Sequence, residues 1–224
     1  MKKLLLASLM AMMFVMVAPA TIIDNFTSPD QYTCSPTSVG PGSCQAPPAV
    51  STSSTGSATT TINGNRAITI VGNPVGVSNA NVEFGSLNFN SPVAGTGTLT
   101  VDWGGLAFDL ASTGEFLFTF NFFGNDNGGQ YLVTISDGTD SATSGPTAIP
   151  AAPPSSGFVS IGLASFSNWA AIDQSNINSI TFQFSGNTAT DISFDNFMFA
   201  TPEPSTLVLL GSALVGLAFY RRRK

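Results

Sequence analysis

The sequence predicts an all-β protein, an antiparallel two-sheet sandwich flanked by two targeting segments. Between residues 21 and 200 no stretch carries apolar residues at helical spacing over about three turns. Short runs rich in Val, Ile, Phe and Thr instead alternate with segments rich in Gly, Asn, Asp and Pro. No repeat with a period of about 20 to 50 residues is present, which disfavours a solenoid or a propeller. Several short strands in one domain of this length predict a sandwich.

The first 20 residues have the pattern of a signal peptide. Lys2 and Lys3 precede an apolar run over residues 4–17, and Ala18-Pro19-Ala20 ends the segment with the small residues that signal peptidase accepts. We expect a removable signal helix at 1–20, with cleavage after Ala20. The alternative is an uncleaved anchor, but about 14 apolar residues are fewer than the roughly 20 that span a bilayer. The protein is therefore predicted to be exported.

Residues 21–200, the body of the protein, form one acidic domain. Arg66 is its only basic residue and stands against twelve carboxylates, so the net charge of the body is −11. Such a surface repels phosphate backbones and argues against nucleic-acid binding. Either solubility or an affinity for divalent cations would explain the excess of acidic residues.

The predicted strands are distributed over the whole body. They cover residues 66–71, 81–89, 97–103, 115–123, 131–136, 158–163, 179–184 and 191–199. In residues 116–122 the four phenylalanines at even positions share one face, which is predicted to belong to the core. The same period occurs in residues 180–184, and in residues 191–199 the even-numbered side chains are expected to lie opposite the odd-numbered ones.

The remaining segments of the body are predicted to be connections. Two segments rich in Ser, Thr, Ala and Pro are expected to be loops, residues 51–61 and 141–156. A short helical connector is expected at residues 167–177. Residues 124–129 are predicted to form a hairpin loop of residues that tolerate positive φ. Their Asp and Gly content also occurs in calcium loops, but the spacing and the closing Glu of an EF-hand are missing.

Cys34 and Cys44 are the only cysteines, with nine residues between them. After export they would meet an oxidising environment, in which such a pair closes a small loop. We therefore expect a disulfide. A metal site is disfavoured, because the chain offers only two thiols and no histidine.

Three parts follow the last predicted strand. Pro202-Glu203-Pro204 is expected to be extended, because proline lacks an N–H and restricts the residue before it. Residues 207–220 carry no charge and predict a membrane helix, although about 14 residues rise only about 21 Å, less than the roughly 30 Å hydrocarbon core. Residues 221–224 are all basic and are predicted to stay cytoplasmic.

This tail, residues 201–224, resembles the PEP-CTERM sorting signal of Gram-negative bacteria. In that family an exosortase, a membrane-embedded cysteine peptidase, is implied to cut near the Pro-Glu-Pro and to release the protein to the cell surface or the extracellular polymer. The resemblance implies that Pro202, Glu203 and Pro204 are the sorting signal and that exosortase and signal peptidase are the processing partners. A simple tail anchor is the alternative. The precursor is then tethered to the inner membrane by its C-terminal helix, and the mature protein is the acidic body.

The absence of histidine excludes the Ser-His-Asp and Cys-His mechanisms and histidine-ligated zinc. Catalysis by two carboxylates would need a defined pair in one cleft, and the scattered acidic residues nominate none. We therefore expect no enzymatic activity.

The two ends of the body carry related motifs, Ile23-Asp24-Asn25-Phe26 and Phe194-Asp195-Asn196-Phe197. They resemble the opening and closing strands of jelly-roll domains of the galactose-binding and carbohydrate-binding-module kind. That resemblance implies a structural Ca²⁺ with Asp24 and Asp195 among its oxygen ligands. The alternative is that both aspartates accept backbone N–H bonds at turns or strand ends.

Trp103 and Trp169 are the candidates for stacking on a sugar ring, and burial in the core is the alternative for each. Two functions are compatible with the sequence. The first is a non-catalytic structural or adhesive component of the surface or biofilm matrix, and the second is a lectin-like module that binds extracellular polysaccharide, stabilised by calcium.

Overall fold

The structure is a computed structural model that describes residues 20–26, 31–35, 50–58, 64–72, 78–91, 96–151 and 155–201. Apart from Ala20 and Thr201, the predicted signal helix and the predicted sorting tail lie outside these residues. None of the helices within these ranges is both long enough and apolar enough to cross a membrane.

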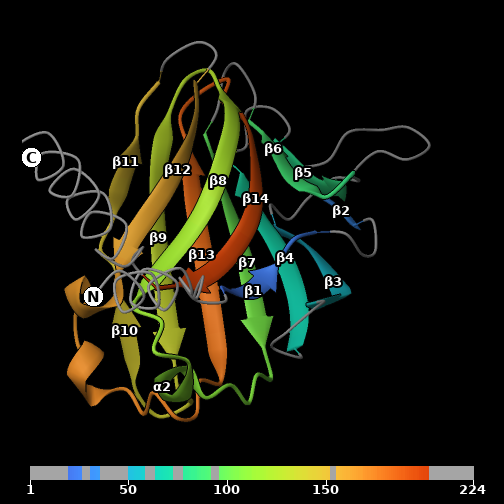
Figure 1. Cartoon of the computed structure of the whole chain (residues 1–224). Coiled ribbons are helices and arrows are strands. Elements are labelled where there is room, and N and C mark those ends of the chain that lie inside the picture. Colours follow the sequence, from blue (N-terminus) through green and yellow to red (C-terminus); the bar gives the residue numbers. More distant parts are fainter. Residues whose placement is uncertain are drawn as a thin grey trace, which may run out of the picture.

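Two antiparallel sheets, A and B, pack face to face (Figure 1). Sheet A contains, in spatial order, β12 (Ser155–Gly162), β8 (Leu117–Asn125), β14 (Asp191–Ala200), β6 (Ser86–Asn90), β5 (Ser78–Glu83) and β2 (Gln31–Ser35), with β1 (Thr21–Asp24) paired to β14. Sheet B contains β10 (Ser141–Thr143), β9 (Gly129–Ser136), β13 (Ser179–Gly186), β7 (Gly97–Gly104), β4 (Gly64–Gly72) and β3 (Val50–Ala58), with β11 (Thr147–Ile149) paired to β9. The predicted antiparallel two-sheet sandwich is confirmed.

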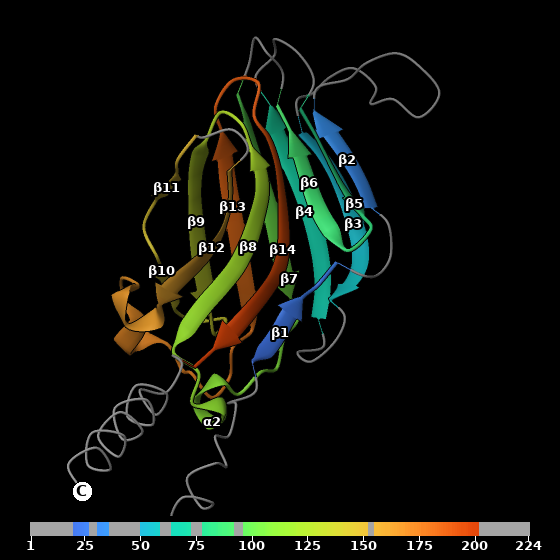
Figure 2. The ribbon, with the colours of Figure 1, turned by 45° about the horizontal axis from the view of Figure 1, so that its top comes forward.

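The chain passes repeatedly from one sheet to the other. β6, β8, β12 and β14 belong to sheet A, whereas β7, β9 and β13, which lie between them in sequence, belong to sheet B. The view in Figure 2 shows the two layers from a second direction. Alternation of this kind is the jelly-roll arrangement. Within the described ranges, three short helices lie in the connections: α2 (Leu110–Thr113), η1 (Leu163–Ser165) and η2 (Trp169–Ala171).

Several predicted connections are wrong. Residues 124–129 do not close a hairpin, because β8 and β9 lie in different sheets, and the loop instead crosses the end of the sandwich. The expected loop at 51–61 is largely strand β3, and the expected loop at 141–156 contains β10 and β11. Ser and Thr tolerate an extended backbone when a neighbouring strand is available, and here β4 and β9 provide the partners.

A β-bulge in β14 changes the alternation that the sequence predicts. Asp195 is opposite Asn121 and Met198 is opposite Thr119, so β14 has one residue more than β8 in this interval. Asn196 takes up the extra residue with φ 52°, in the left-handed region. As a result Phe194 and Phe197 both point into the core, and the two faces predicted for 191–199 exchange after Asp195.

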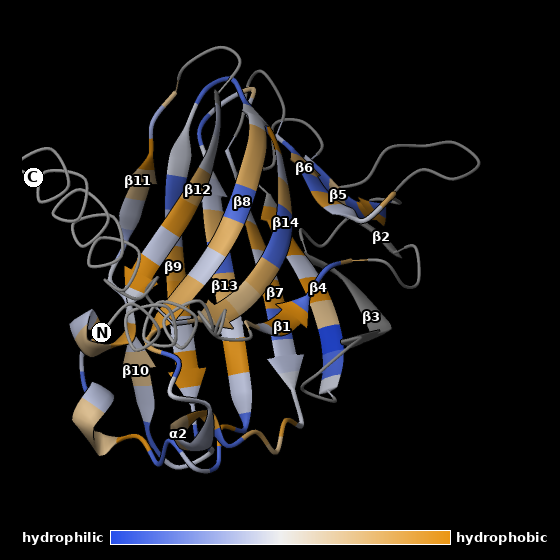
Figure 3. Ribbon diagram, in the orientation of Figure 1, coloured by the Kyte–Doolittle hydropathy of each residue, from blue (hydrophilic) through white to orange (hydrophobic). Residues whose placement is uncertain are grey.

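Phenylalanine fills the space between the sheets. Three of the four phenylalanines predicted to face the core, Phe118, Phe120 and Phe122, are buried, as are Ile180, Phe182 and Phe184 in β13. The prediction is wrong for Phe116, which precedes β8 and is 63% exposed. Phe197 lies at the centre of this group, because its ring centroid is within 6.3 Å of those of six other aromatic residues. Hydrophilic positions interrupt the hydrophobic ones along β8 and β14 (Figure 3), as expected for strands with one buried face.

The predicted strand 81–89 is a hairpin, formed by β5 and β6. Its two-residue turn has positive φ at both positions, 51° at Phe84 and 79° at Gly85. A type I′ turn of this kind favours Asn-Gly, and a bulky residue is strained there. The Phe84 side chain is 94% exposed, so burial offsets none of this strain.

Replacement of Phe84 by asparagine is therefore expected to raise the free energy of unfolding by about 1 kcal/mol. The melting temperature should rise by about 2–4 °C for a domain of this size. Phe84→Ala is the control, because it removes the ring without providing the amide that tolerates positive φ, and it should change the melting temperature little. A lower melting temperature for Phe84→Asn would show that the turn is not strained.

Candidate functional site

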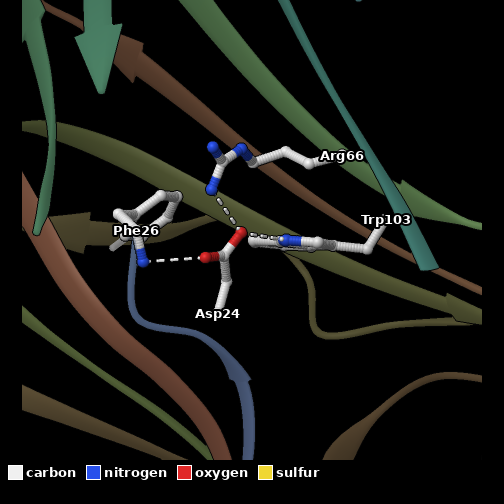
Figure 4. Close-up of polar contacts among 4 residues, drawn as sticks. All are labelled: Asp24, Phe26, Arg66 and Trp103. Carbon is white, nitrogen blue, oxygen red and sulfur yellow. Dashed lines mark hydrogen bonds and ion pairs between the residues drawn. The ribbon is translucent and has the colours of Figure 1, made fainter. Parts of the chain in front are cut away.

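Asp24, the first predicted calcium ligand, lies at the end of β1 and points into the space between the sheets (Figure 4). Its carboxylate is fully buried. Oδ2 accepts hydrogen bonds from Arg66 Nη1 and Trp103 Nε1, each at 2.8 Å, and Oδ1 accepts one from the backbone N–H of Phe26, also at 2.8 Å. The backbone bond to Phe26 matches the turn alternative considered for this aspartate, whereas the side-chain partners were not expected.

The positive charge beside Asp24 is Arg66, which is also fully buried. Arg66 has the same parity as Ile68 and Ile70 in β4, and Trp103 is its cross-strand neighbour in β7. The guanidinium also lies over the ring of Phe26, 5.2 Å from the centroid. These contacts offset the free-energy cost of removing both charges from water. An isolated buried ion would have no such compensation. Asp24, Arg66 and Trp103 thus form a polar lock that holds β1 of sheet A against sheet B.

Asp195, the second predicted calcium ligand, lies on the other face of sheet A. It alternates with the buried Phe194, is half-buried, and its Oδ2 accepts a hydrogen bond of 2.6 Å from Asn196 Nδ2. Desolvation raises the pKa of Asp195, partly offset by a hydrogen bond from the Asn196 backbone N–H. Because Asp24 faces inward and Asp195 outward, the two do not form the predicted shared calcium site. No group of three or more Cys, Asp or Glu residues within the described ranges has the geometry to hold a metal ion.

The two tryptophans have different environments. Trp103 is fully buried and donates to Asp24, so its ring has no surface to stack on a sugar, and its predicted role in carbohydrate binding is wrong. Trp169 lies in η2, packs edge-on against Phe166 with the centroids 6.0 Å apart, and keeps part of its surface exposed. Sugar binding by Trp169 stays a prediction.

The remaining predicted sites include residues that lie outside the ranges described by the structure. Cys34 belongs to β2, but Cys44 lies outside the described residues, so the disulfide stays a prediction. Pro202, Glu203 and Pro204 also lie outside them.

The outer face of sheet A carries a set of side chains that the sequence alone did not nominate. We call it the amide face. Its members, taken across the strands, are Asn79, Asn90 and Asp191 in one row, Asn81, Asn88, Ser193 and Phe123 in a second, and Asp195, Asn121 and Phe158 in a third.

Hydrogen bonds join neighbouring side chains within two of these rows. Ser193 Oγ donates to Asn88 Oδ1 at 2.6 Å, and Asn90 Nδ2 donates to Asp191 Oδ1. Burial raises the pKa of Asp191, and the nearby Asp126 carboxylate raises it further. Asparagine is normally depleted in strands, so five of them on one sheet face are unusual. Their recurrence at every second position, 79 and 81 and then 88 and 90, is the signal in the sequence that could have identified this face.

Two phenylalanines give the amide face an apolar area. Phe158 of β12 is opposite Asn121 and is 62% exposed, and Phe123 of β8 lies on the same face and is half-exposed. Amide groups both donate and accept hydrogen bonds, and exposed rings offer flat apolar surface. A neutral, polyhydroxylated ligand matches this combination chemically.

Comparisons with known proteins give a fold likeness and one sequence motif. A search of curated proteins gives no match to this sequence. Among solved structures, the chain is similar to a family 11 carbohydrate-binding module of the cellulosomal cellulase Lic26A-Cel5E of Clostridium thermocellum, with 14% identity over 83% of this chain and 96% of that chain and a TM-score of 0.42. A non-crystalline cellulose specific carbohydrate-binding module, CBM28, has 14% sequence identity over 59% of this chain and 82% of that chain, with a TM-score of 0.38. The agarase AgWH50C has 16% sequence identity over 59% of this chain and 22% of that chain, with a TM-score of 0.42.

Identities this low concern the fold alone and assign no ligand to this chain. The C-terminal segment is different, because residues 200–224 match the family described as the PEP-CTERM protein-sorting motif. The chain therefore carries the sorting tail that its sequence resembles.

Proposed function

We propose that the mature protein is an exported, non-catalytic β-sandwich that binds neutral polysaccharide with the amide face and so acts as an adhesive component of the cell surface or the extracellular matrix. The PEP-CTERM motif at residues 200–224 supports the destination. The single observation that supports the activity is the amide face, where five asparagines and two exposed phenylalanines lie in register across neighbouring strands.

The charge of the molecule favours a neutral ligand. The charged side chains of the amide face, Asp191 and Asp195, are both acidic. Arg66, the only basic residue of the body, is buried against Asp24. An anionic polymer would therefore be repelled by this face, whereas a neutral one would meet hydrogen-bonding groups and two apolar rings.

The two ends of the body support the proposed route to the surface. Thr21 is paired with Phe199, so the chain enters and leaves the sandwich at the same end. The predicted signal helix precedes Thr21, and the predicted membrane helix follows a few residues after Ala200. In the precursor both segments would hold this end of the sandwich at the inner membrane. Signal peptidase and an exosortase, cutting near Pro202, Glu203 and Pro204, would then release it.

Affinity gel electrophoresis tests the binding. The protein is run through gels that contain neutral polysaccharides, such as a mixed-linkage β-glucan, a galactan and agarose, or acidic ones, such as alginate. We expect retardation by at least one neutral polymer and none by alginate. Phe158→Ala should weaken binding about tenfold, which corresponds to about 1.4 kcal/mol.

The control is Phe116→Ala. Phe116 is 63% exposed, almost the same as Phe158, but it precedes β8 and its backbone N–H bonds to Ala200 O at the end of the sandwich. Binding should be unchanged in this variant. Equal losses in the two variants, or retardation by alginate alone, would contradict the proposed face.

A further inference from the structure

Glu115 has a buried carboxylate, and only one of its two oxygens has a hydrogen-bond partner among the described residues. It follows Gly114, which ends α2 with φ 67°, and its side chain is only 3% exposed. Oε1 accepts a hydrogen bond of 2.6 Å from the backbone nitrogen of Thr21. Oε2 is buried and has no hydrogen-bond partner in the part of the chain that the structure describes.

A buried carboxylate with one neutral donor is costly, because the charged form loses hydration that a single amide does not replace. The body supplies no spare cation, since Arg66 is its only basic residue and binds Asp24. The other charged group of β1 is Asp24 itself, and residues 198–200 of the adjacent β14 carry no charge. The side chains of the body therefore offer Glu115 no cation.

We propose that Glu115 is the binding site for the α-ammonium group that signal peptidase creates at Thr21. Hydrolysis of the Ala20–Thr21 peptide bond adds water across it, so that Ala20 gains the carboxylate and Thr21 the amine, which takes up a proton at neutral pH. The nitrogen already lies 2.6 Å from Oε1. The single amide N–H becomes three N–H donors with a positive charge, and a second of these donors can serve Oε2.

This inference rests on the cleavage site that the proposed export route assumes. It gives processing a structural consequence, because Thr21 begins β1 and is paired with Phe199 of β14. An ion pair at this position fixes the first strand at the end where the sorting tail leaves the sandwich. The processed protein is then more stable than the precursor, and a chain that begins one residue earlier lacks the ion pair.

Two chains that differ by one residue test the inference. Chains 21–224 and 20–224 are released in mild detergent from a fusion partner that leaves no additional residue, each with Glu115 and with Glu115→Gln. We expect chain 21–224 to melt about 4–8 °C above chain 20–224, from the usual strength of a charge-assisted buried hydrogen bond and the size of the domain. With Glu115→Gln the difference should disappear.

The pKa of the N-terminal amine gives a second readout, which does not depend on whether Glu115→Gln folds. Titration of the unmodified α-amine, followed by NMR through the ¹³C chemical shifts of the N-terminal residue, should give a pKa above the usual range of about 7.7–8.0 in chain 21–224, and an ordinary value in chain 20–224. The extra stability should be present below the ordinary pKa and be lost as the pH rises through the elevated one. Equal melting temperatures, or an ordinary pKa in chain 21–224, would overturn the inference.

The N-terminal mass of the exported protein checks the cleavage site itself, and a terminus other than Thr21 would also overturn the inference. Neither result affects polysaccharide binding by the amide face, which is measured separately with the variants at Phe158 and Phe116.

Discussion

Replacement of Arg66 by methionine is expected to lower the free energy of unfolding by about 3–5 kcal/mol. The substitution keeps much of the side-chain volume but removes the cation that contacts Asp24 Oδ2 at 2.8 Å. The Asp24 carboxylate would then remain buried between the sheets with Trp103 Nε1 and the Phe26 N–H as its donors. Urea unfolding, followed by tryptophan fluorescence, measures the loss.

The double variant Asp24→Asn/Arg66→Met separates loss of the pair from exposure of an unpaired charge. It removes both charges and keeps an amide at position 24 that can still accept from Trp103. Because much of the cost of Arg66→Met is the uncompensated carboxylate, the double variant should recover at least half of the stability. A double variant no more stable than Arg66→Met, or a single variant that loses less than about 1 kcal/mol, would contradict the role of the polar lock.

Replacement of Phe197 by alanine is expected to cost about 3–5 kcal/mol, comparable with the loss of Arg66. Its ring packs against those of Phe26 and Phe182, with centroids 5.6 and 4.8 Å away, and against Trp103 at 5.2 Å. Removal of the ring would leave a cavity among side chains from β14, β13, β7 and the segment after β1. Chemical denaturation should show the loss as a lower midpoint at an unchanged slope.

Phe116→Ala is the matched control, because it deletes the same ring at a position that is 63% exposed. Its stability should stay within about 0.5 kcal/mol of the unmodified protein. If the two phenylalanine variants were equally stable, the core of the sandwich would not be organised around Phe197.

The strands that the sequence predicts best are those whose alternation is regular over their whole length. β7, β9 and β13 appear close to their expected positions because Leu, Val, Ile and Phe recur at every second residue in them. The fold class follows from such strands. The exchange of faces in β14 could not be predicted, because a bulge at Asn196 depends on the pairing with β8 and leaves no distinct pattern in the sequence.

Polar residues caused two further errors of the sequence prediction, at β3 and at Asp24. β3 is rich in Ser and Thr, and it forms because β4 offers its free edge. Arg66 has the parity of Ile68 and Ile70, so its inward direction was visible in the sequence. Its partner was not, because Asp24 is 42 residues away and reaches it from the opposite sheet. The calcium predicted at Asp24 rested on its carboxylate alone, and in the structure this carboxylate contacts Arg66 of β4.

An NMR titration of the processed, ¹⁵N-labelled protein with a neutral oligosaccharide that retards it in the gel tests the central claim, binding by the amide face, most directly. We predict that the perturbed amides cluster in β8, β14, β6 and β12, around Asn121, Asn88 and Phe158. The amides of β4 and β7, on the opposite sheet, should be unaffected. Perturbations confined to the region of Trp169, or to the loops at the ends of the sandwich, would contradict the claim.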